Sequence, residues 1–556
     1  KLQNTSTMVY NTITSLVRLS LQLAKAPIFA LTNSTFRKSM TGQRWATLYD
    51  ELCELRREIS SLEGLLNLAD WDQQVGMPTG GGEARARQMG ALTAVLARMR
   101  KDPKIGEILA VLETEEVRNE MDEMQLAMLR ECRRSFNKYS RVPDDLIREE
   151  TELSSMSYNI WVEAREKSDF SLFAPYLQQL VDIRRKIALL IAPDREPYDT
   201  EIDQYEKGMS AARIEAIFNE LKAGLLPLIK KLDEAKESHV SEALAEDSDH
   251  LKNYGPFDVA VQEEVCKHIA EKIGFDFEKG QLNTSVHPFT ISYHPTDVRI
   301  TSRYDEEYFA EGLMGAIHEV GHALYEQGRK CTDEMDDLPI NEALSMGVHE
   351  SQSLFWERMI GQSAEFWEGV GAPLMHEYFD KLKPLSPSFF YKSINRMQRS
   401  LIRVSADEVT YPLHIVIRFE LERGLFDGSI KVEDLPREWN RRYVEYLGIE
   451  PPNDAEGVLQ DSHWSGGCFG YFPSYTLGAM IATQLFAAAQ QCIPNLKEEI
   501  RKGNLRVLHP FLREKVWERG SIPPSADALV KEATGEELSC KPFLQYLDEK
   551  YSRLYC

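Results

Sequence analysis

Two histidines and a glutamate stand close together in the run His318-Glu319-Val320-Gly321-His322. Four residues of α-helix turn by roughly 400°, so the two imidazoles would leave one face of a helix, one turn apart. Neutral imidazoles at this spacing can bind one zinc-like ion, and Glu319 can then take a proton from a water molecule on that ion. The alternative is a surface helix that carries two titrating histidines.

A catalytic zinc site needs a third protein ligand and one open position for water. Residues 332–339 are acidic, contain a proline and lack helical periodicity, so they indicate a loop. Residues 341–358 indicate a second helix, which would return Glu350 to the metal face of the first helix. Glu342 is the alternative ligand, or else a first-turn charge favoured by the helix dipole. His349 either hydrogen-bonds to a ligand or simply packs.

The elements that position these residues are predicted to be mostly helices. Residues 45–66 carry apolar side chains at steps of three and four, which indicates one long amphipathic helix. Further helical patterns include residues 306–330 and 399–424. Residues 283–303 are rich in β-branched and aromatic side chains and predict a small antiparallel sheet just before the metal helix. Its edge could hold an extended peptide, or the hairpin only covers the core.

Composition favours a large soluble enzyme. The chain has 556 residues, of which 43% are hydrophobic and 28% charged, enough for an extensive core. The net charge of −23 would repel nucleic acid and anionic lipid, so neither is an expected partner. We find no stretch long and apolar enough to span a membrane. The eight cysteines are scattered without a Cys-x-x-Cys pair, which favours reduced thiols in an intracellular compartment.

The N-terminal segment differs from the rest of the chain. Residues 1–49 contain no Asp or Glu and are basic and rich in Ser and Thr, like an organellar transit peptide. A disordered tail, or sequence outside the mature protein, is the alternative. We therefore expect an N-terminal extension at 1–44 and a helical catalytic domain at 45–556. The expected compartment is a plastid or mitochondrion if the extension is a transit peptide, and the cytoplasm otherwise.

Three further groups of residues could bind substrate. Arg299 either pairs with Asp297 and holds the sheet or binds substrate. Arg403 and Asp407 are four residues apart, which on a helix would give a salt bridge. The glycine-rich segment 457–478 has a composition that suits a flexible stretch presenting hydrogen-bond donors to a peptide. Its polar and aromatic residues are Gln460, Asp461, His463, Trp464, Tyr471 and Tyr475.

Six short motifs occur in a fixed order along the chain. They are His287-Pro288-Phe289, Asp297-x-Arg299-x-Thr301, the HEVGH run, His349-Glu350-Ser351, Ile402-Arg403-x-x-Ala406-Asp407 and Gly457-x-x-Gln460-Asp461-x-His463-Trp464. In content and order, these motifs resemble those of the carboxypeptidase Taq family of metal-dependent carboxypeptidases. The resemblance covers residues 45–556, and only the N-terminal extension lies outside it.

This resemblance implies a mainly α-helical, two-lobed metallopeptidase with a deep active-site cleft, a small sheet beside the metal helix and commonly a homodimer. It implies one divalent ion per subunit, zinc or alternatively cobalt. The implied ligands are His318, His322 and Glu350, with Glu319 as the general base.

The other candidate residues are assigned to substrate and to the transition state. Arg403 and His463 would bind substrate or stabilise the transition state. Tyr471 and Tyr475 look like the tyrosines that donate to the oxyanion in related helical metallopeptidases. Together with Arg403, the residues Arg299 and His287 are the candidates for substrate binding.

The predicted function is release of single C-terminal amino acids from peptide substrates with broad specificity. Arg403 would pair with the terminal carboxylate of the peptide, which makes the enzyme an exopeptidase. The nearest alternative is an endo-oligopeptidase or peptidyl-dipeptidase on a similar scaffold. A non-catalytic peptide-binding protein with a structural metal is disfavoured, because no cysteine stands at ligand spacing.

Overall fold

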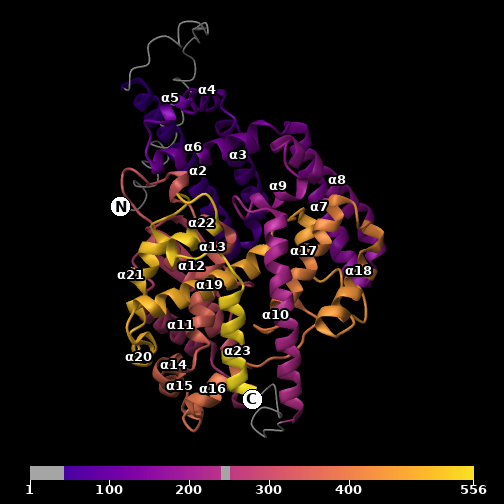
Figure 1. The fold of residues 1–556 in the computed structure, drawn as a ribbon, viewed down its shortest axis with the longest axis vertical. Helices are drawn as coiled ribbons and strands as arrows, with labels where there is room; N and C mark the ends of the chain where they lie inside the picture. The colour runs from indigo at the N-terminus through magenta and orange to yellow at the C-terminus, as the bar shows by residue number, and fades with distance from the viewer. Residues whose placement is uncertain (1–42, 239–250, 556) are drawn as a thin grey trace. The chain divides into compact units, whose positions relative to one another are not determined.

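The computed structural model describes residues 43–238 and 251–555 (Figure 1). The predicted extension 1–44 therefore lies outside the described residues, except for its last two positions. Residues 51–556 form one compact unit, to which the following description applies. None of the described helices combines the length and the apolarity that crossing a bilayer requires.

Helices make up most of the described chain, as predicted. Those before the sheet are α2 (Gln43–Val75), α3 (Gly82–Arg100), α4 (Pro103–Leu112), α5 (Glu115–Arg118), α6 (Glu123–Ser140), α7 (Asp144–Lys167), α8 (Phe170–Ile191), α9 (Pro197–Asp203), α10 (Ala211–Ser238) and α11 (Val259–Ile273). Those after it are α12 (Phe309–Gly328), α13 (Met346–Leu354), α14 (Ala364–Phe366), α15 (Ala372–Tyr378), α16 (Pro387–Ile394), α17 (Tyr411–Asp427), α18 (Leu435–Arg442), α19 (Pro473–Cys492), α20 (Leu496–Arg501), α21 (His509–Leu512), α22 (Ala526–Thr534) and α23 (Lys541–Tyr555).

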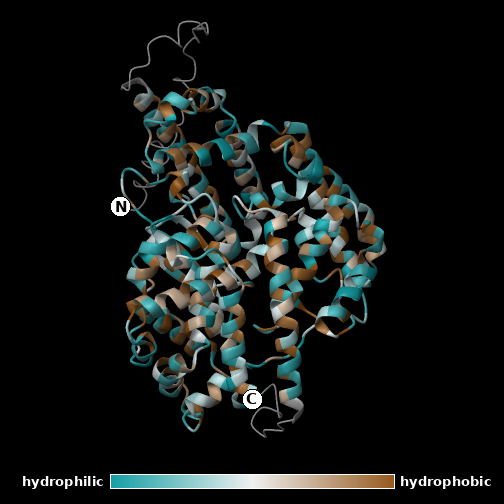
Figure 2. Cartoon of the chain, in the orientation of Figure 1, coloured by the Kyte–Doolittle hydropathy of each residue, from teal (hydrophilic) through white to brown (hydrophobic). Residues whose placement is uncertain are grey.

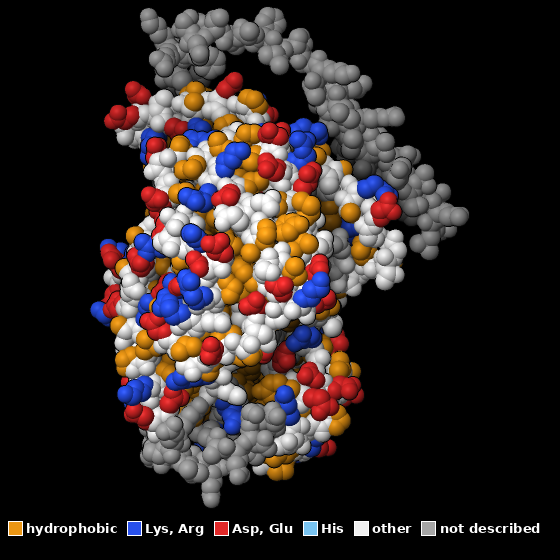
Figure 3. Space-filling view, turned by 90° about the vertical axis from the view of Figure 1, so that its right-hand side faces the viewer, with side chains coloured by type: hydrophobic (Ala, Val, Ile, Leu, Met, Phe, Trp, Pro, Cys, Tyr) orange, Lys and Arg blue, Asp and Glu red, His pale blue; other side chains and the backbone are white. Residues whose placement is uncertain are grey.

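Amphipathic packing explains the helical arrangement. The long helix predicted from residue 45 is α2, and Leu52 and Ile59 of its apolar series are buried. Figure 2 shows hydrophobic and hydrophilic residues on the same helices throughout the fold. Elements far apart in sequence pack together in this way: α23 lies along α10 (Figure 1). On the face drawn in Figure 3, acidic and basic side chains are interspersed among apolar ones.

The small sheet lies just before the metal helix, where it was predicted, but it is mixed and not antiparallel. Its strands are β1 (Gly280–Thr284), β2 (Thr290–His294) and β3 (Asp297–Ser302), in the order β1-β3-β2. The pair β2–β3 is antiparallel and the pair β1–β3 is parallel. The parallel pair arises because residues 285–289 carry the chain across the end of β3. Thr301 holds this crossing, since its Oγ1 accepts from the Phe289 amide at 2.9 Å.

The two helices predicted around the metal are α12 and α13. The second begins at Met346 and not at residue 341, because the Ser345 Oγ accepts from the Val348 amide at 3.1 Å and caps it there. It continues as a π-helix from Phe355 to Gly361. The two helices cross closely between the paired histidines: a Cβ on Gly321 would lie 2.5 Å from the Gln352 carbonyl oxygen.

Helix α19 packs against the other side of α13 (Figure 1). A Cβ on Gly478 of α19 would lie 2.9 Å from the Glu350 Cβ, so only glycine leaves room for that glutamate. The buried Glu206 joins the same two helices, because its Oε1 accepts from the Gly347 amide at 2.5 Å and from the Ser474 hydroxyl at 2.6 Å. These contacts fix the position of α13.

The helix predicted for residues 399–424 begins only at Tyr411. The Asp407 Oδ1 accepts from the amides of Val409 and Thr410, at 2.8 and 3.0 Å, and supports the start of α17. Arg403 lies in a short 3-10 turn before it. The predicted salt bridge between Arg403 and Asp407 is therefore wrong, and Arg403 has a different partner, described below.

Candidate active site

Two imidazoles and one carboxylate converge between α12 and α13. The Oε2 of Glu350 lies 3.8 Å from the Nε2 of His318 and 3.4 Å from the Nε2 of His322. In a tetrahedral zinc site with bonds of about 2.0–2.2 Å, donor atoms lie about 3.3–3.6 Å apart. The three residues therefore fit one ion with little movement. Glu342, the alternative ligand, is exposed and lies outside this group.

The outer nitrogens of both imidazoles are already hydrogen-bonded. The Nδ1 of His318 lies 2.7 Å from the Oε2 of Glu357. The Nδ1 of His322 lies 2.6 Å from the Nδ1 of His349, whose Nε2 lies 2.9 Å from the Oε1 of Glu326. One assignment of protons satisfies this chain: His349 donates to Glu326 and accepts from His322. The Nε2 of His322 then carries its lone pair toward Glu350, and His349 supports a ligand, one of the two predicted alternatives.

The site has an excess of negative charge. Burial lowers the pKa of His318, but the carboxylates of Glu350, Glu357 and Glu319 outweigh burial and raise that pKa to about 10. Burial also opposes ionisation of Glu350, yet His318 and His322 bring its pKa down to about 2. Burial is the main cause that lowers the pKa of His322 to about 4 and keeps it neutral. Three carboxylates around the imidazole pair thus favour a cation at this point.

Glu319 lies beside the ligand group and is held by the sheet. The Thr290 hydroxyl of β2 donates to its Oε2 at 2.6 Å. Only 6% of the Glu319 surface is exposed, and burial, opposed mainly by His318, raises the pKa of this carboxyl. A raised pKa suits a carboxylate that accepts a proton and later returns it.

Four of the predicted residues form a second cluster next to Glu350. The rings of Tyr471 and Tyr475 lie 5.3 Å apart, and the Tyr475 hydroxyl is 3.5 Å from the Nε2 of His463. The guanidinium carbon of Arg403 lies 5.0 Å from the centre of the Tyr475 ring. Burial, followed by the charge of Glu350, raises the pKa of Tyr471 to about 12. Both tyrosines are therefore protonated at neutral pH and can donate hydrogen bonds.

Arg403 is fixed by a network that the sequence did not reveal. Its Nε donates to the Oδ1 of Asp461 at 2.9 Å, and its Nη1 donates to the Tyr411 hydroxyl at 2.8 Å. The Nε of Arg418 donates to the Oδ2 of the same aspartate at 2.7 Å. Burial opposes ionisation of Asp461, but the two arginines hold its pKa well below the usual range. The guanidinium of Arg403 is thereby held in one orientation.

Within the described part of the chain, the two remaining predicted residues make no hydrogen bond or ion pair with either cluster. Arg299 donates from Nε and Nη2 to the carboxylate of Asp297, both at 2.9 Å, as the sequence suggested. Its guanidinium carbon lies 4.9 Å from the centre of the Tyr293 ring. His287 is exposed in the connection between β1 and β2. Substrate binding by either residue stays a prediction.

Sequence reasoning missed Glu357, Thr290, Tyr411 and Arg358. Glu357 follows Glu350 by two turns, but it lies in the π-helical stretch. The spacing of apolar residues does not reveal a π-helix, so the sequence did not predict this stretch. Burial raises the pKa of Glu350 and Glu357, and the neighbouring histidines lower it. The positive charge of Arg358 lowers both pKa values further. Its Nη1 is buried and has no hydrogen-bond partner among the described residues. It therefore offers a second cation close to the ligand group.

Known proteins are similar to this chain along most of its length. The profile of the family described as carboxypeptidase Taq (M32) metallopeptidase matches residues 51–551. Carboxypeptidase 1 of Bacillus subtilis is 36% identical, over 92% of this chain and 99% of that protein. Thermostable carboxypeptidase 1 of Thermus thermophilus is 38% identical, over 91% and 99%. The solved structure of Trypanosoma cruzi metallocarboxypeptidase 1 matches with a TM-score of 0.85 at 38% identity, over 91% of this chain and 99% of that one.

Proposed function

The chain belongs to the carboxypeptidase Taq (M32) family and is a metallocarboxypeptidase, and we propose that it releases single C-terminal amino acids from peptides with broad specificity. The observation that carries the proposal is the convergence of two imidazole Nε2 atoms on the carboxylate of Glu350. Three ligands leave one coordination position open, which is typical of catalytic and not of structural zinc sites.

His318, His322 and Glu350 would hold one divalent ion per subunit, zinc or alternatively cobalt. The donor set supports this choice, because imidazole and carboxylate suit both metals. When bound, such an ion lowers the pKa of a water molecule and polarises the peptide carbonyl. The hydrogen bonds from Glu357 and His349 to the outer nitrogens keep both imidazoles in the ligating orientation.

Glu319 would act as the general base and then as the general acid. Its carboxylate takes a proton from the attacking water and later delivers it to the leaving amine. Burial favours this role, since a raised pKa lets the carboxyl hold the proton between the two transfers. The Thr290 hydroxyl donates to one carboxylate oxygen, which leaves the other free to face the water.

The cluster of Arg403, His463, Tyr471 and Tyr475 would bind the substrate and the developing oxyanion. The tyrosine hydroxyls are the donors best suited to the oxyanion, because they stay protonated and lie close to Glu350. Arg403 would pair with the terminal carboxylate of the peptide. A cation already fixed by Asp461 would lose little conformational freedom when the substrate binds.

Timed mass spectrometry of a short peptide tests the proposal. The enzyme is incubated with the free peptide and with its C-terminally amidated form, each with added zinc or cobalt and with a chelator. We expect stepwise loss of single C-terminal residues from the free peptide, and loss of this activity with the chelator. Release of dipeptides would indicate a peptidyl-dipeptidase, and internal fragments from both peptides an endo-oligopeptidase. The homodimer expected from the family resemblance is checked separately by sedimentation.

A further inference from the structure

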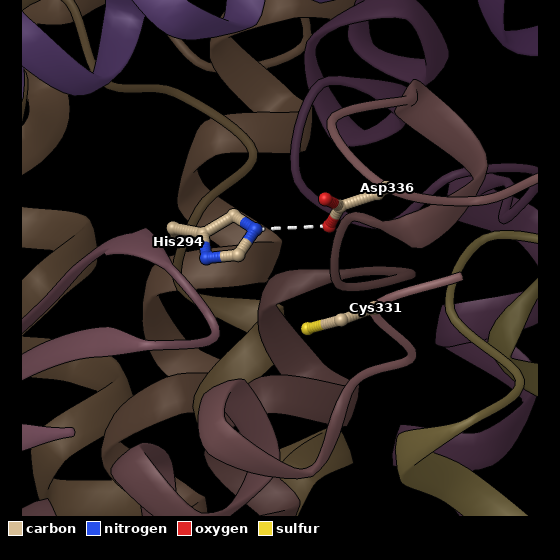
Figure 4. A group of neighbouring side chains, drawn as sticks. All are labelled: His294, Cys331 and Asp336. Atoms are coloured by element: carbon tan, nitrogen blue, oxygen red, sulfur yellow. Dashed lines mark hydrogen bonds and ion pairs between the residues drawn. The ribbon is translucent and has the colours of Figure 1, made fainter. Parts of the chain in front are cut away.

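A second group of metal-binding side chains lies outside the active site. It consists of His294 at the end of β2 and of Cys331 and Asp336 in the loop that follows α12. One ligand atom from each residue lies within 4.8 Å of the other two. Figure 4 shows the three side chains around one space, with the His294 ring facing the Asp336 carboxylate. Imidazole, thiolate and carboxylate together suit zinc and similar divalent ions.

The distances are close to those of a bound site. The Nε2 of His294 lies 2.9 Å from the Oδ1 of Asp336, and donors around a tetrahedral zinc ion lie about 3.3–3.6 Å apart. To admit an ion in place of this hydrogen bond, the two side-chain atoms would move apart by about half an ångström. The Cys331 sulfur lies within 4.8 Å of the other two ligand atoms, so it has to approach by at most about 1 Å, which is feasible because the residue is exposed.

The loop that carries the two ligands is held in place from both sides. The Met335 side chain is buried, and its amide donates to the Thr332 carbonyl at 2.9 Å. The Asp336 amide donates to the same carbonyl at 2.8 Å. Arg57 of α2 donates to the carbonyls of Asp333 and Asp336, at 2.5 and 3.3 Å. The loop backbone is therefore fixed close to His294 before any ion binds.

The imidazole of His294 is also oriented for a metal. Its Nδ1 accepts from the Thr296 amide at 3.3 Å and lies 2.6 Å from the Thr296 hydroxyl. When Nε2 binds an ion, the ring proton moves to Nδ1, where the Thr296 hydroxyl can accept it. A hydrogen-bonded outer nitrogen is the usual support of a ligating histidine.

We propose that His294, Cys331 and Asp336 form a second site for a zinc-class divalent ion (Zn²⁺, Co²⁺ or Cd²⁺), with solvent at the fourth position. Its ion would tie the end of β2 to the loop that leaves the metal helix. Strand β2 also carries Thr290, the partner of Glu319. His294 and Thr290 stand at opposite ends of this strand, so the site stabilises the fold locally without holding Glu319, while the catalytic ion stays with α12.

Cobalt titration of the metal-free protein distinguishes the two sites. A cobalt–thiolate bond gives a strong charge-transfer band in the near ultraviolet, and the catalytic site contains no sulfur. We expect wild type to bind two cobalt ions per chain and to show this band. Cys331→Ser should bind one ion, lack the band and keep the kcat/KM of wild type for peptide hydrolysis. Cys492→Ser, which removes another exposed thiol, is the matched control and should keep the band.

Two further variants test whether all three residues bind the ion. His294→Gln and Asp336→Asn should each weaken cadmium binding at the sulfur-containing site by at least about tenfold, since even outer-shell partners contribute 10–100-fold. Unchanged cadmium affinity in both variants would show that Cys331 binds the metal alone, and would overturn the proposal. It would also be overturned if wild type lacked the band or if Cys331→Ser retained it.

Discussion

The hydrogen bond between Glu357 and His318 provides a sharp test of how the metal ligands are positioned. Its length of 2.7 Å and the carboxylate acceptor mark it as a charge-assisted bond. Glu357→Gln keeps the size of the side chain and can still place an amide oxygen at Nδ1. It removes the negative charge, so the imidazole loses both basicity and part of its orientation. The variant should bind metal more weakly without a change in fold.

The magnitude follows from the position of Glu357 behind a ligand. Loss of such an outer partner typically weakens metal binding by about 10–100-fold, or about 1.4–2.7 kcal/mol. Glu357 also contributes to the excess negative charge that raises the pKa of His318. The lower charge acts in the same direction as the lost hydrogen bond, so we expect an effect near the upper end of this range.

The assay is competition for zinc between the protein and a chromophoric chelator at fixed pH. The matched control is Glu368→Gln, which lies in the next helical stretch and pairs on the surface with Arg501 at 2.7 Å. The control should keep the affinity of wild type. If Glu357→Gln bound zinc within twofold of wild type, the idea that this carboxylate orients His318 would be wrong.

Three other substitutions test separate parts of the account. His322→Ala should lose the ion of the ligand group and turnover together, measured by elemental analysis and peptide hydrolysis; a metal content equal to that of wild type would remove His322 from the ligand set. Arg403→Lys should lower kcat/KM for peptides with a free C-terminus by at least about tenfold, because it loses one charge-assisted hydrogen bond of about 1.5–3 kcal/mol. An unchanged kcat/KM would indicate that Arg358 binds the terminal carboxylate instead. Burial raises the pKa of Glu206 from 4.5 to about 7. The neutral carboxyl therefore contributes fully to the free energy of unfolding below pH 4.5, and this contribution is lost as the pH rises through 7. Glu206→Gln should therefore raise the melting temperature relative to wild type at pH 8 but not at pH 5; an equal effect at both pH values would contradict this.

Local sequence patterns predicted the ligand group because its geometry is local. The spacing of His318 and His322 is set by one helical turn, and the loop before α13 is short enough to return Glu350 to the same place. The sheet before α12 was recognised from its β-branched residues. Its parallel pairing was not, since that depends on how residues 285–289 cross the end of β3.

Contacts between distant segments could not be predicted from the sequence. Arg403 and Asp407 share a helical spacing, but Arg403 instead pairs with Asp461, which belongs to another segment and also binds Arg418. Glu357 contacts His318 from the π-helical continuation of α13, a contact between two separate helices. Such pairings depend on tertiary packing, which a single sequence does not encode in any local period.

The role of Glu319 is the centre of the proposed mechanism, and one variant measures it directly. Glu319→Gln leaves His318, His322 and Glu350 in place and can keep the hydrogen bond from Thr290. Metal content and single-turnover hydrolysis are measured on the same preparation. We expect the variant to bind one ion per chain in the ligand group, as wild type does. Its rate of hydrolysis should be lower than that of wild type by about 10²–10⁴-fold, the usual contribution of a general base. A metal-loaded variant that hydrolyses peptide at the wild-type rate would contradict the mechanism.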